Sequence, residues 1–93
     1  MSPLEQFFDS RKIDCRGVPV DILERAKGTI EKIEAGTHFK HLGGQRIKFD
    51  RNQISFDVGL RWRIIAVDLG DRVQIKRVVS HEKYNCWVRN NGR

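Results

Sequence analysis

The hydrophobic period of the sequence changes once, from about 3.6 residues to two, and this change limits the folds that the chain can adopt. Residues 19–35 carry apolar side chains at helical spacing, between a proline typical of a helix start and a glycine typical of a helix end. These positions share one helix face: Ile22, Leu23, Ala26, Ile30 and Ile33. Residues 46–79 instead alternate between apolar and polar, as half-buried strands do. The sequence therefore predicts an amphipathic helix packed on a β-sheet.

Turn-forming residues divide the alternating region into three or four strands. Residues 50–52 and 68–71 are typical of turns, and Gly59 ends the strand that carries Ile54, Phe56 and Val58. Residues 62–67 are almost continuously apolar, as expected of a central strand covered on both faces. We therefore predict an α+β fold, with one or more N-terminal helices on one face of an antiparallel meander. The other face should be more open.

The two ends of the chain carry weaker signals. Ser2 and Pro3 resemble the start of a short helix that would reach about Ser10. Residues 12–15 could form a short strand, and residues 81–93 could hold one helical turn before a frayed end at residues 89–93. A length of 93 residues fits a single domain spanning 1–93, because two separate cores would each be too small. Residues 1–17 form its less regular extension.

Several classes of protein are disfavoured by what the sequence lacks. No apolar run approaches the ~18 residues of a transmembrane helix, and the N-terminus does not resemble a secretory signal. Two cysteines far apart in sequence do not suggest a disulfide framework. The cysteines and histidines fit no zinc spacing, and no phosphate-binding loop is present. We expect a cytoplasmic protein that uses no metal, no cofactor and no membrane.

The charge of the chain is concentrated in its second half. The net charge is +6, and residues 1–45 hold seven basic and seven acidic residues. Residues 46–93 hold eleven basic and only five acidic residues. An excess on one part of the surface favours a polyanionic partner, most often nucleic acid, or an acidic protein segment. A basic protein without such a partner is the simpler alternative.

His81 and Tyr84 are the side chains best suited to proton transfer or base stacking, and basic residues precede them along the chain. Metal-independent RNA cleavage needs a base for the 2′-hydroxyl, cations for the phosphorane charge and an acid for the leaving oxygen. The sequence offers candidates for each role. Spacing alone favours plainer roles, with Arg63 as a structural ion-pair partner inside a buried strand and His81 as a helix cap.

Three stretches taken in order resemble the RelE/ParE superfamily of bacterial toxins, particularly its HigB-like and ParE-like branches. They are residues 37–42 (THFKHL), residues 54–65 (ISFDVGLRWRII) and residues 80–85 (SHEKYN), and the likeness extends over residues 18–88. The resemblance implies a toxin of a type II toxin–antitoxin system, bound by a cognate antitoxin protein. It also implies a metal-independent endoribonuclease, an mRNA interferase that acts on mRNA in the ribosome and arrests translation.

The resemblance also assigns roles to individual residues. His81 and Tyr84 match the catalytic pair of the HigB-like ending, Lys40 matches the lysine of a short "FK" segment, and Arg61 lies just before the aromatic–arginine pair. We expect these four side chains to converge on one basic surface. The candidates for RNA binding around them are Arg46, Lys48, Arg51 and Lys83. Asn85 stands where many members carry aspartate.

Two other functions stay open at this point. A ParE-like toxin on the same scaffold would inhibit DNA gyrase without nuclease activity, although such toxins generally lack the His/Tyr pair. A nucleic-acid-binding module without toxicity would also explain the basic second half.

Overall fold

The computed structural model describes residues 2–91 and has the predicted α+β architecture. Two helices come first, α1 (Pro3–Ser10) and α2 (Val20–Glu34), followed by the short 3₁₀ helix η1 (Phe39–Leu42). Four strands follow as β1 (Gln45–Ile47), β2 (Asp50–Val58), β3 (Trp62–Asp68) and β4 (Val73–Ser80). The last element is α3 (His81–Asn91). Within residues 2–91, no helix is long and apolar enough to cross a membrane.

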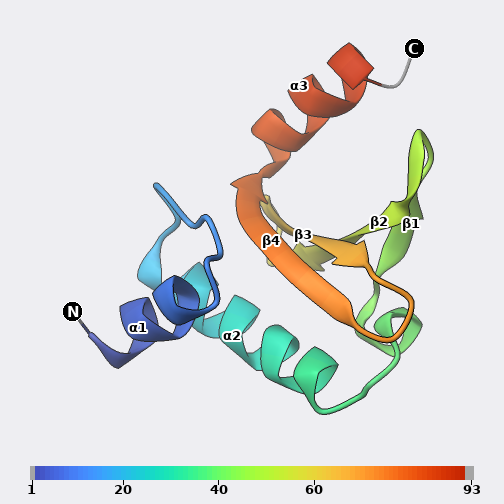
Figure 1. Ribbon diagram of the computed structural model, residues 1–93. Helices are drawn as coiled ribbons and strands as arrows, with labels where there is room; N and C mark the ends of the chain where they lie inside the picture. The colour runs from blue at the N-terminus through green and yellow to red at the C-terminus, as the bar shows by residue number, and fades with distance from the viewer. Residues whose placement is uncertain (1, 92–93) are drawn as a thin grey trace.

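The strands form the predicted antiparallel meander in the order β1-β2-β3-β4 (Figure 1). Strand β3 pairs with β2 on one side and with β4 on the other, so that Ile64 lies between Phe56 and Val78. The register between β3 and β4 shifts by one residue after Ile65. Because side chains alternate across a strand, Ile64 and Ala66 face α2 whereas Ile65 faces the opposite side.

Helix α2 closes one face of the sheet. All five of its predicted apolar positions are buried, and Ala26 and Ile30 are 0% exposed. They pack with a layer of strand side chains that includes Ile54, Phe56, Val58, Ile64, Ala66 and Val78. The periodicity of the sequence therefore identified both sides of the main core.

Glycine is required where η1 meets the sheet. A Cβ atom at Gly44 would lie 2.6 Å from Cε2 of Phe56 and 2.9 Å from the carbonyl oxygen of Phe39. Both distances are too short for a side chain. The backbone at Gly44 can therefore approach β2 closely, which brings Phe39 into the core.

The N-terminal extension adds to this core. Ser2 caps α1 by accepting a hydrogen bond from the Glu5 N–H at 3.2 Å, and Phe8 is 1% exposed. The chain then reaches β4, where Asp14 forms an isolated parallel bridge with Arg77. Its N–H donates to the Lys76 carbonyl at 3.1 Å, and its own carbonyl accepts from the Val78 N–H at 2.8 Å. Residues 12–15 thus provide one bridge rather than a full strand.

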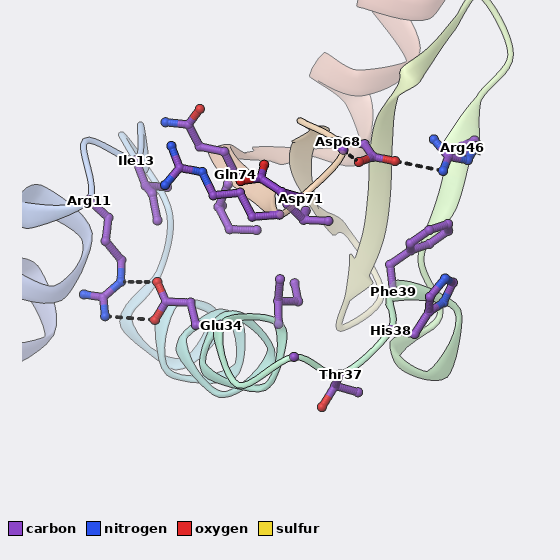
Figure 2. Close-up of a pocket in the computed structure, with 16 residues that line it drawn as sticks. Arg11, Ile13, Glu34, Thr37, His38, Phe39, Arg46, Asp68, Asp71 and Gln74 are labelled. Atoms are coloured by element: carbon purple, nitrogen blue, oxygen red, sulfur yellow. Dashed lines mark hydrogen bonds and ion pairs between the residues drawn. The ribbon is translucent and has the colours of Figure 1, made fainter.

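An ion pair joins this extension to the end of α2 (Figure 2). The Arg11 guanidinium donates to both carboxylate oxygens of Glu34, at 2.8 and 3.0 Å. This hydrogen bonding lowers the pKa of Glu34. The Arg11 Cζ atom also lies 3.7 Å from the centroid of the Phe7 ring, so one side chain links α1, the extension and α2.

Two sequence-based boundaries were wrong. The β1–β2 turn lies at residues 48–49 rather than 50–52, because Asp50 already pairs with Ile47. Helix α3 has 11 residues instead of one turn, and it includes residues 89–91, which were expected to fray. The remainder of that predicted frayed end, residues 92–93, lies outside the described residues.

The packing of α2 leads to a prediction for Ile30. Replacing Ile30 with Asp should lower the free energy of unfolding by several kcal/mol, roughly 3–5, because it buries an unpaired carboxylate. Glu24→Asp is the control, since it places the same side chain at an exposed position of the same helix. Urea unfolding would measure both, and equal midpoints for Ile30→Asp and the wild type would contradict the packing.

The Arg11–Glu34 pair leads to a pH-dependent prediction. The two side chains are 34% and 45% exposed, so Glu34→Gln should cost only about 0.2–1 kcal/mol at neutral pH. Because the pKa of Glu34 is lowered by folding, the ion pair stabilises the fold above the carboxylate's ordinary range and loses this effect as pH falls. The difference in unfolding free energy between variant and wild type should therefore be smaller at about pH 3 than at pH 7. A difference of equal size at both pH values would argue against the ion pair.

Candidate functional site

The candidate site forms where β4 runs directly into α3. Ser80 ends the strand, and its hydroxyl accepts a hydrogen bond from the Lys83 N–H at 3.2 Å, as an N-cap does. His81 is consequently the first residue of α3 and Tyr84 lies one turn later, on the same side of the helix. In Figure 1 this helix extends away from the end of β4 instead of lying along the sheet.

The turn between β2 and β3 meets the start of this helix. The His81 N–H donates to the Arg61 carbonyl at 2.7 Å, and the neighbouring Trp62 is paired with Ser80. Arg61 itself is exposed and His81 is half-buried. The backbone therefore brings these two predicted site residues into adjacent positions.

Arg63 is the residue at this site whose position the sequence analysis did not anticipate. Its Cζ atom lies 4.5 Å from the centroid of the Tyr84 ring, and its Nη1 forms an ion pair of 3.2 Å with Asp57. Its Nε is buried and has no hydrogen-bond partner among the residues that the structure describes. The structural ion pair expected of Arg63 is thus present, and its guanidinium also packs against the Tyr84 ring. The sequence signal was the placement of Arg63 next to Ile64, which turns it away from the core.

A second arginine and two aromatic rings tie α3 to the sheet. The Arg77 Cζ atom lies 5.0 Å from the Trp87 ring centroid, and the Phe49 and Trp87 rings lie 4.9 Å apart. Trp87 also contacts the Tyr84 ring at 6.0 Å. On this side of the sheet Ile65 is 1% exposed. The second face is therefore partly covered, and it is less open than the sequence suggested.

The other predicted site residues are spread over the molecule. Lys40 lies on η1, which leads into β1, whereas His81 follows β4 at the opposite edge of the sheet. Arg46 is held in an ion pair of 2.8 Å with Asp68 and donates to the Arg51 carbonyl at 2.7 Å. The remaining candidates are exposed: Lys48 in the β1–β2 turn, Arg51 in β2 and Lys83 in the first turn of α3.

The described part of the chain contains no group of three or more histidine, cysteine or acidic side chains that could hold a metal ion. The chemistry available at the start of α3 is therefore that of an imidazole, a phenol and two guanidinium groups. Guanidinium groups bind phosphate oxygens in a bidentate manner, and aromatic rings can stack on bases.

A comparison with protein-family models matched the ParE-like toxin domain over residues 20–86. The match includes α2, the whole sheet and the first half of α3, so the chain belongs to the family of ParE-like toxins. It is a toxin of a toxin–antitoxin system, as the resemblance of its motifs implied. Neither the curated proteins nor the solved structures gave a match. Residues 1–19, which include helix α1, lie outside the matched region.

The contacts of Trp87 lead to a prediction for α3. Trp87→Ala should lower the free energy of unfolding by about 1–3 kcal/mol, because it removes two aromatic ring contacts and a cation–π contact. Amide hydrogen exchange in residues 81–90 should become faster, since those contacts hold the helix on the sheet. Arg89→Ala, at an exposed position of the same helix, is the control. Unchanged exchange in Trp87→Ala would show that α3 is held by other contacts.

Proposed function

We propose that this toxin is a metal-independent endoribonuclease that cleaves mRNA on the ribosome and thereby arrests translation. The proposal depends mainly on one observation, the meeting of the β2–β3 turn with the start of α3 through the hydrogen bond between His81 and Arg61. That contact brings an imidazole and a phenol close to two arginine-bearing segments. Such groups supply the proton transfer and charge stabilisation that RNA cleavage needs.

Each residue has a distinct role in the proposed reaction. His81 either removes the proton from the 2′-hydroxyl, as a general base, or gives a proton to the leaving 5′-oxygen, as a general acid. Histidine suits either role because it readily changes protonation near neutral pH. Tyr84 stacks on a base or assists this proton transfer. Arg61 binds the scissile phosphate, and Arg63, which lies beside Tyr84, adds positive charge near it.

The outlying basic residues take part by binding the RNA rather than by catalysis. Lys48, Arg51 and Lys83 are exposed and can contact the phosphate backbone. Lys40 lies too far from His81 to act on the same phosphate, so it would bind a more distant part of an RNA strand that crosses the sheet from the β1 edge. Arg46 is already paired with Asp68, which makes it the weakest of these candidates.

Inhibition of DNA gyrase is the second candidate function. The observation that favours it is the family match itself, which is to the ParE-like toxin domain. In that case His81 and Tyr84 have no catalytic role, and the basic surface binds a protein or DNA. The antitoxin is the expected partner in both cases.

Two substitutions test the nuclease. His81→Ala and Arg61→Ala should fold as the wild type does but lose toxicity, and loss of the proton-transfer group should slow cleavage by about 10²–10⁴-fold. Each toxin is induced in a bacterial host, and growth, protein synthesis, mRNA integrity and the DNA-damage response are followed separately. Arg72→Ala is the matched control for Arg61→Ala, because Arg72 is an exposed arginine beside the turn at the other end of β3.

The outcomes separate the two functions. Cleaved mRNA and early arrest of translation, both abolished in His81→Ala, support the ribonuclease. A DNA-damage response with intact mRNA, retained in His81→Ala, supports gyrase inhibition. Loss of toxicity that merely follows a lower melting temperature would assign both residues a structural role.

A further inference from the structure

A cleft opens on the α2 side of the sheet, at the end opposite to the candidate nuclease site. It has a volume of about 730 Å³ and lies between the C-terminal half of α2 and the β3–β4 hairpin (Figure 2). Apolar side chains from four segments line it: Ile13, Ile33, Phe39, Val73 and Ile75. Ile33 and Ile75 are 8% and 7% exposed, whereas Ile30, one turn earlier on α2, is 0% exposed. The helix thus packs closely on the sheet at its middle, whereas at this end the edge of the core lines the cleft.

Charged groups close both ends of the cleft without giving it a net charge. The Arg11–Glu34 pair stands at one end and the Arg46–Asp68 pair at the other, as Figure 2 shows. The pKa of Glu34 is lowered by its hydrogen bonds from Arg11. The pKa of Asp68 is lowered by the Gly70 N–H and then by Arg46, so both carboxylates stay ionised. The lining holds three arginines and three carboxylates in all: Arg11, Arg46, Arg72, Glu34, Asp68 and Asp71.

This balance distinguishes the cleft from the rest of the molecule, which carries a net charge of +6. A polyanion gains little in a neutral cleft whose arginines are largely paired within the protein. An apolar side chain, in contrast, gains by leaving water for the accessible part of the core. The charge of the cleft therefore favours a protein segment with few charges over nucleic acid.

Beside this cleft, the outer edge of β4 has no strand paired with it among the residues that the structure describes. Within residues 2–91, the outer edge of β4 is bridged by the N-terminal extension at Asp14–Arg77. The extension reaches β4 only at Asp14, because the preceding Ile13 N–H still donates to the Phe8 carbonyl of α1. Residues 73–75 therefore form the outer edge of the sheet beside the cleft. Edge strands of this kind are templates for an added strand.

We propose that this cleft binds an extended segment of the antitoxin. The segment would continue the outer strand that Asp14 begins, would pair with residues 73–75 of β4, and would insert alternate apolar side chains between Ile33 and Ile75. The inference rests on the assignment of the chain as a toxin but not on its being a nuclease. Arg11 and Ile13 lie outside the region that matches the family, so the cleft depends on the extension that this chain adds to the domain.

A peptide selection tests the surface directly. Twelve-residue peptides from a random display library are selected on the purified full-length protein, and the best is synthesised as the probe. We expect a peptide with alternating apolar residues and little net charge. Recovery of only acidic peptides, or of none, would overturn the proposal.

The binding site is then located with two matched variants. Val73→Arg places a charge at the cleft, whereas Val79→Arg makes the same change at another half-buried valine of β4, close to Arg63. The peptide should bind Val73→Arg about tenfold or more weakly and Val79→Arg with wild-type affinity. Equal losses in both variants, or a loss in Val79→Arg alone, would contradict the cleft as the binding site.

Nuclear magnetic resonance on the wild-type chain gives a result that does not depend on how well Val73→Arg folds. The bound peptide should shift the amide signals of Ile13, Ile33 and residues 73–75. Shifts confined to residues 81–88 would overturn the proposal, as would displacement of the peptide by a twelve-nucleotide single-stranded RNA. None of these measurements requires nuclease activity, so a failure of the proposed cleavage reaction would leave this inference intact.

Discussion

Burial of the third strand on both faces is the constraint on which the rest of the structure depends. Ile64 and Ala66 pack toward α2 at 0% exposure, and Ile65 is 1% exposed on the other side. A strand of this kind needs a partner strand on each edge and a cover on each face. The meander supplies the edges, α2 covers one face, and α3 with the tip of the β1–β2 hairpin partly covers the other. The hydrophobic core of this small domain is therefore built around one seven-residue strand.

The helices α2 and α3, which cover the two faces of the sheet, differ in chemistry, and only α3 carries side chains of the proposed nuclease site. Helix α2 buries aliphatic side chains against apolar strand side chains such as Phe56 and Ile64, which gives stability without chemical reactivity. Helix α3 presents Tyr84 and Trp87 to Arg63 and Arg77. Cation–π contacts hold that helix in place while keeping cationic groups near the surface. A polyanion that binds this end of the sheet would compete for the same guanidinium groups that help to hold the helix.

The sequence predicted the parts of the fold that depend on local pattern. The helix over 19–35 and the strands over 46–79 were predicted because residues such as Ile30 and Phe56 repeat at the period of their element. The length of helix α3 was underestimated because its aromatic rings face arginines, so it lacks the aliphatic repeat that marks a core helix.

The adjacency of Arg61 and His81 could be expected from a meander that returns to the same edge. The contact between Arg63 and Tyr84 could not be predicted, because it depends on the pairing of β3 with β4 and on the angle at which α3 leaves the sheet. The cleft was equally unpredictable, since its walls come from segments more than 60 positions apart, at Ile13 and Ile75.

The proposed nuclease site and the proposed cleft for the antitoxin lie on different faces and at different ends of β4, and this separation limits how an antitoxin can act. From Ile75 to Ser80, β4 advances by five residues, or about 17 Å. A segment bound beside Ile75 is therefore too far from His81 to block it directly. An antitoxin bound at the cleft could inhibit the toxin in two ways. It could carry a second segment that covers the basic residues near α3, or the rest of the antitoxin could sterically keep the toxin from its target. In the first case, the neutral cleft provides an apolar anchor that salt does not weaken, and the basic surface provides an electrostatic contact that salt does weaken. Linking two such contacts in one antitoxin chain raises the effective concentration of the second once the first has formed. Tight binding could then arise from two individually modest sites, and loss of the cleft contact alone would free the basic end of the toxin.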